Sequence, residues 1–444
     1  MLVIVAVSLL VHVPNLLNYP AWFFDEGAYL TFSAQWVQTG QLSYYGHPFG
    51  ALTILAILFA AVNPGTYLYP RLLMVALSAL DGVLLYKVTD MMYQRSGGFA
   101  LVAALLYVAT PLSARYLRLV VVDNFMALFL LMSLLVLLKK RENNLVSALL
   151  FGGAIVSKQT ALFFIPAFLV YFRREKRTLA RTLLWFVLAA VIPVLWAVYG
   201  VSQIGLTAFL DSQFALTGLG GERAVNGLTL ILQRITSRDP FIFVGIAGAL
   251  WASYKRDPLV VFPLTYLLSF AVLFLKISTV YLIPVLPFFS ILATLLLFDA
   301  FDLTPRLRAL VKFRGYVLTV LIAALIISSL LLVTLQNPAT PQQQAINYVV
   351  DQHPQGVILS YTYLWLFRQN HPEISVYDRY SVPWKQLQNQ TVYLVVDYPG
   401  DIVTINSIPQ YHALYYSNAT QQSTKTFTDT ASGYTVQVLQ GTVT

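Results

Sequence analysis

The sequence predicts a polytopic α-helical membrane protein with about eleven transmembrane helices and a small C-terminal α/β domain outside the cytoplasm. Hydrophobic residues make up 58% of the 444 residues and charged residues only 11%, with a mean hydropathy of +0.68. These shares lie far from those of soluble domains. Apolar runs close to the ~20 residues that cross a bilayer recur from the N-terminus to about Leu335. Their repetition excludes one cleaved signal sequence or a single anchor.

The basic residues predict the orientation of these spans. Sixteen of the 28 Lys and Arg residues lie in alternate connections, eight lie in the opposite loops and four in the C-terminal tail. By the positive-inside rule the richer side is cytoplasmic, so the N-terminus is expected inside and the tail outside the plasma membrane. The net charge of +9 therefore orients the chain and does not indicate nucleic acid as a partner. The expected spans lie near residues 2–19, 70–92, 97–117, 120–138, 145–157, 160–172, 181–201, 240–254, 258–275, 279–298 and 315–335.

The first exterior loop, about residues 19–70, is expected to contain two helices in the membrane interface. Between Glu26 and Thr39, aromatic and aliphatic residues recur at helical spacing beside polar ones. The run after Pro48 is apolar but too short to span comfortably.

A change of composition after Leu335 predicts a domain boundary. Residues 1–335 are expected to form the transmembrane catalytic module and residues 336–444 the extracytoplasmic α/β domain. Thr340-Pro341 is a typical start for a helix through Val350, followed by strands near residues 356–367, 374–377, 392–398 and 434–439. The chain has no cysteine, so no disulfide holds this domain together.

Asp25 and Glu26 are the strongest local signal, because carboxylates are scarce and these two adjoin the end of the first span on the exterior side. A carboxylate there can act as a general base. The alternative is structural: Asp25 would cap the interfacial helix and Glu26 would lie in its first turn. Both interpretations can hold together.

Other loops are expected to bring cations to the same membrane face. Lys158 lies between two short apolar segments, where a charge is costly and is by default a functional candidate; the alternative is a simple hairpin turn. Arg118 is another candidate, and the alternative for Arg115 and Arg118 is that both anchor the chain at the membrane interface. The further candidates on this side are Tyr29, His47, Arg71, Asp123, Lys276 and Tyr281. A base together with fixed cations is what transfer from a lipid-linked phosphosugar requires.

In these residues and their order the sequence resembles the C-type (GT-C) glycosyltransferase superfamily, especially the branch of protein O-mannosyltransferases and lipid A aminoarabinose transferases. The motifs are Asp25-Glu26 with Tyr29, His47-Pro48, Arg71-Leu72-Leu73, Lys158, and the stretch from Lys276 to Pro287. The resemblance implies that Asp25 is catalytic and that the donor is a sugar on a polyprenyl or dolichyl phosphate. Phe49 and Gln159-Thr160 depart from the family pattern beside the expected donor pocket.

The resemblance implies an inverting transfer of a single sugar to a hydroxyl of a lipid, glycan or protein acceptor. Asp25 would be the base, with Glu26 as its partner or as a metal ligand. A divalent ion held by Asp25, Glu26 and His47 is one alternative, because some family members use a metal. The donor phosphate would bind Arg71, Arg118, Lys158 and Lys276, in a pocket lined by Tyr29, His47, Asp123 and Tyr281.

A rival hypothesis is a transporter or lipid flippase without transfer chemistry. Transport predicts ionisable residues near the membrane midplane and often repeated halves. The expected spans contain few charges, mainly Asp81, and no internal repeat is found. Clustering of the candidates at one membrane face favours the transferase.

Overall fold

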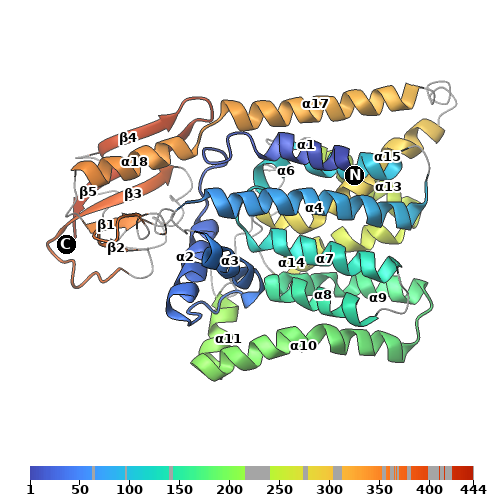
Figure 1. Cartoon of the computed structure of the whole chain (residues 1–444), viewed down its shortest axis with the longest axis horizontal. Helices are drawn as coiled ribbons and strands as arrows, with labels where there is room; N and C mark the ends of the chain where they lie inside the picture. Colours follow the sequence, from blue (N-terminus) through green and yellow to red (C-terminus); the bar gives the residue numbers. More distant parts are fainter. Residues whose placement is uncertain are drawn as a thin grey trace. The chain divides into compact units, whose positions relative to one another are not determined.

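The computed structural model forms two compact units, each of which is described by itself (Figure 1). The first unit comprises Met1–Val13, Leu42–Ile54 and Leu72–Leu330, and the second comprises Pro14–Gln41, Leu55–Arg71 and Leu331–Thr444. The structure describes residues 1–62, 66–95, 98–139, 144–215, 241–273, 279–303, 313–352, 357–360, 365, 367, 370–377, 382–398, 410, 415 and 423–443.

The regular secondary structure described in the first unit is all helical. Its helices are α1 (Leu2–His12), α5 (Phe99–Ala109), α6 (Pro111–Tyr116), α7 (Val122–Lys139), α8 (Asn144–Ser157), α9 (Ile165–Arg174), α10 (Leu179–Ile204), α11 (Leu206–Ala215), α13 (Phe241–Tyr254), α14 (Val261–Leu273) and α15 (Leu286–Leu303). Short 3₁₀ helices connect them: η1 (Gln159–Phe164), η2 (Pro258–Val260) and η3 (Thr279–Val285). Helices α3 (Phe49–Ala61), α4 (Leu68–Tyr93) and α17 (Arg314–Leu335) have residues in both units.

Apolar helices confirm the predicted α-helical membrane protein, whereas the count of eleven spans stays a prediction. Five helical stretches in the described part of the chain are long and apolar enough to cross a membrane: Leu68–Tyr93, Val122–Lys139, Leu179–Ile204, Val280–Ala300 and Arg314–Gln352. Six shorter apolar helices accompany them. The expected span at 97–117 is instead divided between α5 and α6. Thr110 is extended and is followed by Pro111, and its hydroxyl accepts a hydrogen bond from the Ser113 N–H, so it ends α5 and caps α6.

Small residues bring the helices of the first unit together. Gly152 of α8 lies so close to α10 that a Cβ added there would stand 2.6 Å from the Ala189 carbonyl oxygen. Ser133 and Ser147 join α7 to α8 through a 2.8 Å bond to a backbone carbonyl. Close backbone approach and hydroxyl bonds are the usual means by which helices associate in lipid.

The second unit combines α2 (Phe24–Thr39) with α18 (Ala339–Gln352) and a five-stranded sheet. The strands are β1 (Val357–Ser360), β2 (Val376–Tyr377), β3 (Thr391–Tyr398), β4 (Ser423–Asp429) and β5 (Tyr434–Thr442), in the order β2-β1-β3-β5-β4. β1 runs parallel to β2 and β3, and β5 runs antiparallel to β3 and β4. Helix α18 packs on this sheet, as Figure 1 shows, which confirms the predicted small C-terminal sheet domain.

Strand β3 lies at the centre of the sheet, where it pairs with β1 on one side and with β5 on the other. Leu394 pairs with Leu439 of β5 and with Leu359 of β1. Leu359, Leu394 and Leu439 lie in one buried apolar cluster. The sequence analysis did not predict β4, whose residues Ser423–Asp429 are mostly polar and lie at the edge of the sheet.

Candidate functional site

In the second unit, Glu26 and Arg71 form a buried ion pair. Arg71 Nε donates to Glu26 Oε1 and Arg71 Nη2 to Glu26 Oε2, both at 2.9 Å, and both side chains are 0% exposed. Arg71 Nη1 donates to the carbonyl oxygens of Leu16 at 2.8 Å and Pro20 at 3.2 Å. A bidentate pair with its remaining donors satisfied tolerates burial far better than a lone charge. The pair therefore fixes the start of α2 to the start of α4.

Asp25 and Glu26 both lie in the first turn of α2. The N-cap is Phe23, whose N–H donates to Glu26 Oε2 at 3.4 Å. The expectation that Asp25 caps this helix is therefore wrong, and Glu26 satisfies the N-cap backbone. Asp25 is partly exposed, whereas Glu26 is buried.

Aromatic rings surround the Arg71 guanidinium in the same unit. Tyr67 lies beneath it at 5.3 Å, stacks on Trp22 with ring centroids 5.4 Å apart, and meets the edge of Trp365 at 4.7 Å. Burial, and then the nearby Glu26 carboxylate, raise the pKa of Tyr67 well above its usual value. Tyr67 therefore stays neutral, and buried Tyr29 on α2 completes the predicted residues of this unit.

Gln342 of α18 binds the backbone that leads into Asp25. The Trp22 N–H donates to Gln342 Oε1 at 2.7 Å, and Gln342 Nε2 lies 3.2 Å from the Trp22 carbonyl oxygen. The same nitrogen reaches Asp397 Oδ2 at 3.2 Å and the Tyr434 hydroxyl at 3.0 Å. Gln342 is fully buried. The C-terminal domain thus holds the segment three residues before Asp25 by its main chain.

In the first unit, Lys158 is buried against Asp123 and Tyr281. Its Nζ lies 2.7 Å from both Asp123 carboxylate oxygens and 4.0 Å from the centre of the Tyr281 ring. Lys158 is 4% exposed and Asp123 2% exposed. Lys158 stands in extended conformation between the end of α8 and the start of η1, which directs its side chain into the protein. Asp123 occupies the first turn of α7.

His47 lies beside this ion pair on the connection before α3. His47 Nδ1 is 3.3 Å from Gln159 Oε1, and the Gln159 amide donates to Gly46 O at 3.0 Å and to Gln213 Oε1 at 2.7 Å. Gln213 also donates to the Tyr45 carbonyl oxygen. Burial, and then the charge of Lys158, lower the pKa of His47 to about 3. His47 is therefore a neutral hydrogen-bonding group at ordinary pH.

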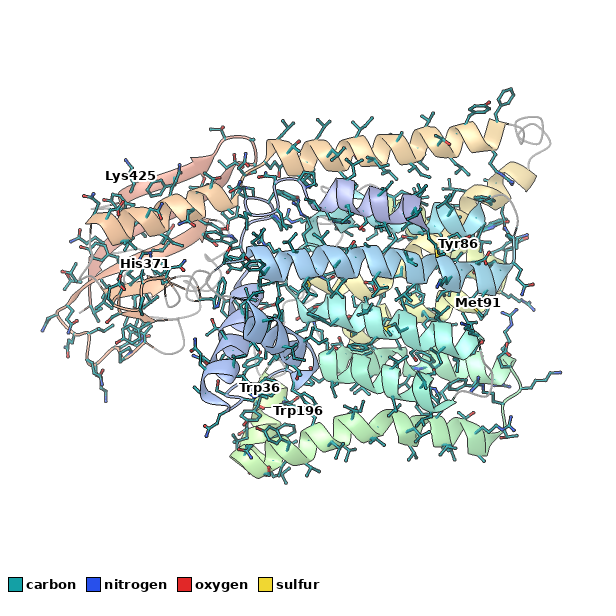
Figure 2. All side chains as sticks on the ribbon, in the orientation of Figure 1. Trp36, Tyr86, Met91, Trp196, His371 and Lys425 are labelled. Atoms are coloured by element: carbon teal, nitrogen blue, oxygen red, sulfur yellow. The ribbon has the colours of Figure 1, made fainter. Side chains whose placement is uncertain are left out.

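Trp196 of α10 fixes the same connection from its other side. Trp196 is labelled in Figure 2. Its ring stacks on Tyr45 with centroids 5.8 Å apart, and its centroid lies 5.6 Å from that of Phe49. Close contact continues at Gly50, where an added Cβ would stand 2.7 Å from the Val156 carbonyl oxygen. The connection from Tyr45 to Gly50 is therefore held against both α8 and α10.

An apolar groove of about 430 Å³ opens next to these residues. It lies between α3, α7, α8 and α10 and is lined by Phe49, Gly50, Thr53, Ile54, Phe129, Val146, Leu149, Leu150, Gly153, Val156 and Ile192. Two of these residues place it: Phe49 follows His47 by two residues, and Val156 precedes Lys158 by two. Lys158 and His47 do not line the groove themselves but lie on the chain segments that do.

The remaining predicted residues divide between a buried turn and an undescribed segment. Arg118 is fully buried in the turn between α6 and α7. The Asn124 amide holds this turn by donating to Leu119 O at 2.8 Å and Tyr116 O at 3.3 Å. Lys276 lies outside the described residues. The phosphate-binding roles of Arg71, Arg118 and Lys276 stay predictions.

The predicted metal ligands do not make a metal site in the described residues. No three His, Asp or Glu side chains come together there in a way that could hold an ion. Both Glu26 oxygens bind Arg71, and the His47 ring is bound by Gln159. This donor set does not fit a divalent ion, which needs several free oxygen or nitrogen ligands.

The sequence did not predict the glutamine and aromatic side chains that hold the candidate residues in place. Gln159, Gln213 and Gln342 make the hydrogen bonds that place His47 and the segment before Asp25. Their only signal in the sequence was a polar amide beside a candidate residue, as in Lys158-Gln159. Such neighbours are too common to select.

Comparison with known proteins gives one family match and several structural ones. Residues 46–199 match the family model of dolichyl-phosphate-mannose-protein mannosyltransferase. ArnT from Cupriavidus metallidurans bound to undecaprenyl phosphate is similar in structure, with a TM-score of 0.56 and 17% identity over 99% of this chain and 97% of that one. No curated protein matches the sequence.

Archaeal oligosaccharyltransferases are similar too. AglB from Archaeoglobus fulgidus, in complex with an inhibitory peptide and a dolichol-phosphate, has a TM-score of 0.61 and 12% identity over 93% of this chain and 70% of that one. The Archaeoglobus fulgidus oligosaccharyltransferase complex with Zn and sulfate has a TM-score of 0.61 and 11% identity, over 91% and 69%. These likenesses show the fold, and with the family match they confirm the predicted resemblance to the C-type glycosyltransferase superfamily.

Proposed function

We propose that this chain, a membrane glycosyltransferase of the C-type superfamily, moves a single sugar from a polyprenyl- or dolichyl-phosphate donor to an acceptor hydroxyl outside the cytoplasm. One observation carries the proposal: the buried, ion-paired Lys158 follows Val156 by two residues, and Val156 lines an apolar groove. A lipid phosphate has the matching form, a charged head on a long apolar chain. The acceptor hydroxyl would belong to a lipid, glycan or protein.

The first unit supplies the donor's contacts in this proposal. Apolar side chains of the groove receive the isoprenoid chain, which packs against them and stays in an apolar environment as it does in the bilayer. Lys158 carries three N–H donors, and Asp123 with the Tyr281 ring holds it in place. A phosphate oxygen that approaches the ammonium gains a charge-assisted hydrogen bond in a site of low dielectric. His47 lies near Lys158 and, with its lowered pKa, is neutral at ordinary pH, so it adds no charge there.

The second unit supplies the base. Asp25 accepts the proton of the acceptor hydroxyl while the hydroxyl oxygen attacks the anomeric carbon of the donor sugar. The bond from that carbon to the lipid-phosphate oxygen breaks. Displacement from the opposite face inverts the anomeric configuration. Glu26 has both oxygens on Arg71, so its part is to position α2 and thereby Asp25. The departing lipid phosphate gains charge, which fixed cations stabilise.

The proposed orientation places the N-terminus in the cytoplasm and the C-terminal domain outside the plasma membrane. It rests on the basic residues of alternate connections. No step of the mechanism uses a metal, because the described carboxylates and histidines do not form a site for one.

Asp25→Asn tests the proposal in a reconstituted transfer assay. This change preserves the shape of the side chain and removes the proton acceptor, so the rate should fall by ~10²–10⁴ with the protein still folded. Asp211→Asn is the matched control, because Asp211 is an exposed helical carboxylate on α11. Transfer by Asp25→Asn within a few-fold of the control would remove Asp25 from the mechanism.

A further inference from the structure

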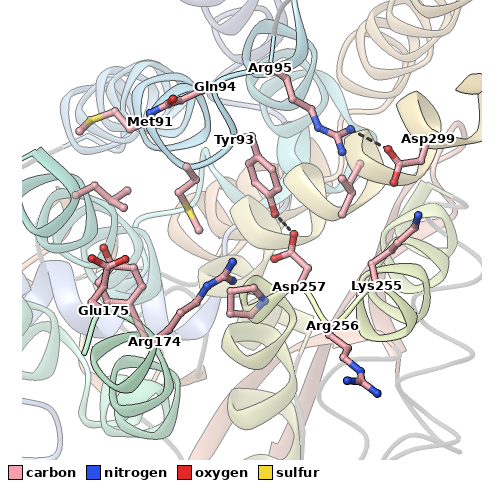
Figure 3. Close-up of a pocket in the computed structure, with 15 residues that line it drawn as sticks. Met91, Tyr93, Gln94, Arg95, Arg174, Glu175, Lys255, Arg256, Asp257 and Asp299 are labelled. Atoms are coloured by element: carbon pink, nitrogen blue, oxygen red, sulfur yellow. Dashed lines mark hydrogen bonds and ion pairs between the residues drawn. The ribbon is translucent and has the colours of Figure 1, made fainter. Parts of the chain in front are cut away.

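A second cavity, of about 660 Å³, lies in the first unit at the ends of α4, α9 and α15 and the connection from α13 to η2 (Figure 3). It is lined by Met91, Met92, Tyr93, Gln94, Arg95, Leu138, Tyr171, Arg174, Glu175, Lys255, Arg256, Asp257, Pro258, Leu295 and Asp299. None of these residues belongs to the apolar groove or contacts Lys158. The proposed glycosyl transfer makes no use of it.

Two carboxylates of this cavity are already held by the protein. Asp257 accepts hydrogen bonds from the Tyr93 hydroxyl and the Leu259 N–H, both at 2.9 Å. Asp299 accepts from Arg95 at 2.8 Å and from the Trp251 indole at 2.9 Å. Figure 3 shows the Tyr93–Asp257 and Arg95–Asp299 contacts as dashed lines. These carboxylates therefore serve to build the walls of the cavity.

Three cations of the cavity differ from these carboxylates, because no ion pair with a described carboxylate holds them. Arg174, Lys255 and Arg256 line it, and no carboxylate among the described residues lies within ion-pair distance of their side chains. Lys255 Nζ lies 5.0 Å over the Trp251 ring, and Arg256 has a left-handed backbone with φ of 56°. The lining as a whole holds four cations and three carboxylates, the third being Glu175, so its net charge is positive and favours an anion.

The cavity also combines the two features that a lipid headgroup site needs, an apolar part beside the cations and a place at the helix ends. Met91, Met92, Leu138 and Leu295 give it an apolar part beside the cations. Its residues end α4 and α9 and connect α13 to η2, on the side that the basic residues predict to be cytoplasmic. Basic hollows between helix ends on that side suit the phosphates of anionic lipids.

We propose that this cavity binds a phosphate-bearing anion through Arg174, Lys255 and Arg256, and that the anion is the headgroup of an acidic phospholipid in the adjoining leaflet. The two phosphate oxygens of a phosphodiester accept hydrogen bonds from the arginine forks and the lysine ammonium. The acyl chains stay in the bilayer beside the apolar part of the cavity. This lipid is a ligand and undergoes no reaction.

The test compares two triple variants of the full-length protein, purified and delipidated in detergent. Arg174→Gln/Lys255→Gln/Arg256→Gln removes the cavity cations, and Arg173→Gln/Lys176→Gln/Arg177→Gln removes the same charge from residues that do not line the cavity. Binding is measured by titration with phosphatidylglycerol in mixed micelles, with phosphatidylcholine as the neutral lipid. A surface cation contributes about fivefold in affinity, so the cavity variant should bind phosphatidylglycerol on the order of a hundredfold more weakly.

The control variant should lose only a few-fold. Equal losses in the two variants would show a diffuse charge effect and overturn the site, and so would an unchanged affinity in the cavity variant. Competition by glycerol 1-phosphate and by inorganic phosphate identifies the source of the anion. If these compete at the concentration at which the lipid binds, the cavity takes a free phosphate and the lipid assignment is wrong. If they do not, the lipid is the ligand.

Discussion

Glu26→Gln should destabilise the second unit strongly, because it leaves Arg71 charged and without its carboxylate in the interior. Both side chains are 0% exposed and both hydrogen bonds of the pair are 2.9 Å long. Removing one partner of a buried ion pair typically costs about 3–5 kcal/mol. Arg71 keeps the carbonyl oxygens of Leu16 and Pro20, so the lower end, about 3 kcal/mol, is expected. Such a loss is a large fraction of the usual stability of a folded domain.

Thermal unfolding in detergent, followed by tryptophan fluorescence, measures this effect. Glu26→Gln/Arg71→Met removes both charges and should recover part of the loss, because no unpaired charge remains. Asp25→Asn, at a partly exposed neighbour, should lower the midpoint far less. Two results would refute the reasoning: a Glu26→Gln protein as stable as the wild type, or a double variant less stable than Glu26→Gln alone.

Three further changes separate the roles of the remaining residues. Lys158→Met should weaken polyprenyl-phosphate binding roughly ten- to a hundredfold in a lipid-phosphate titration, whereas Asp25→Asn should bind normally. Gln342→Leu leaves the Trp22 backbone without its partners. It should lower the transfer rate while the affinity for lipid phosphate persists, and equal loss of both would contradict this positioning role. His47 has a lowered pKa, so the unfolded chain binds more protons between about pH 6.5 and 3 and stability falls as pH drops through that window. His47→Gln should lessen this fall in unfolding scans taken across the window.

Local patterns in the sequence predicted local structure well. Helical spacing after Glu26 corresponds to α2, and Thr340-Pro341 lies in the first turn of α18. Runs rich in β-branched and aromatic residues predicted β3 and β5. These features depend on neighbours a few residues apart, which periodicity and turn chemistry report directly.

Pairing between distant residues was beyond such patterns. Arg71 was expected to bind phosphate, yet its guanidinium contacts a carboxylate 45 residues away, and Gln342 binds a backbone 320 residues away. Asp123 and Lys158 were assigned separate roles and form one ion pair. A polar residue's partner is decided by which elements pack together, and a single sequence gives the type of each residue but not its distant neighbours.

The most direct test of the account follows a labelled polyprenyl-phosphate sugar in liposomes that contain the purified chain. The account predicts that the donor is converted to polyprenyl phosphate, that one sugar appears on the acceptor for each donor consumed, and that its anomeric configuration is inverted. A donor that crosses the bilayer with its sugar still attached would contradict transfer and indicate a flippase instead.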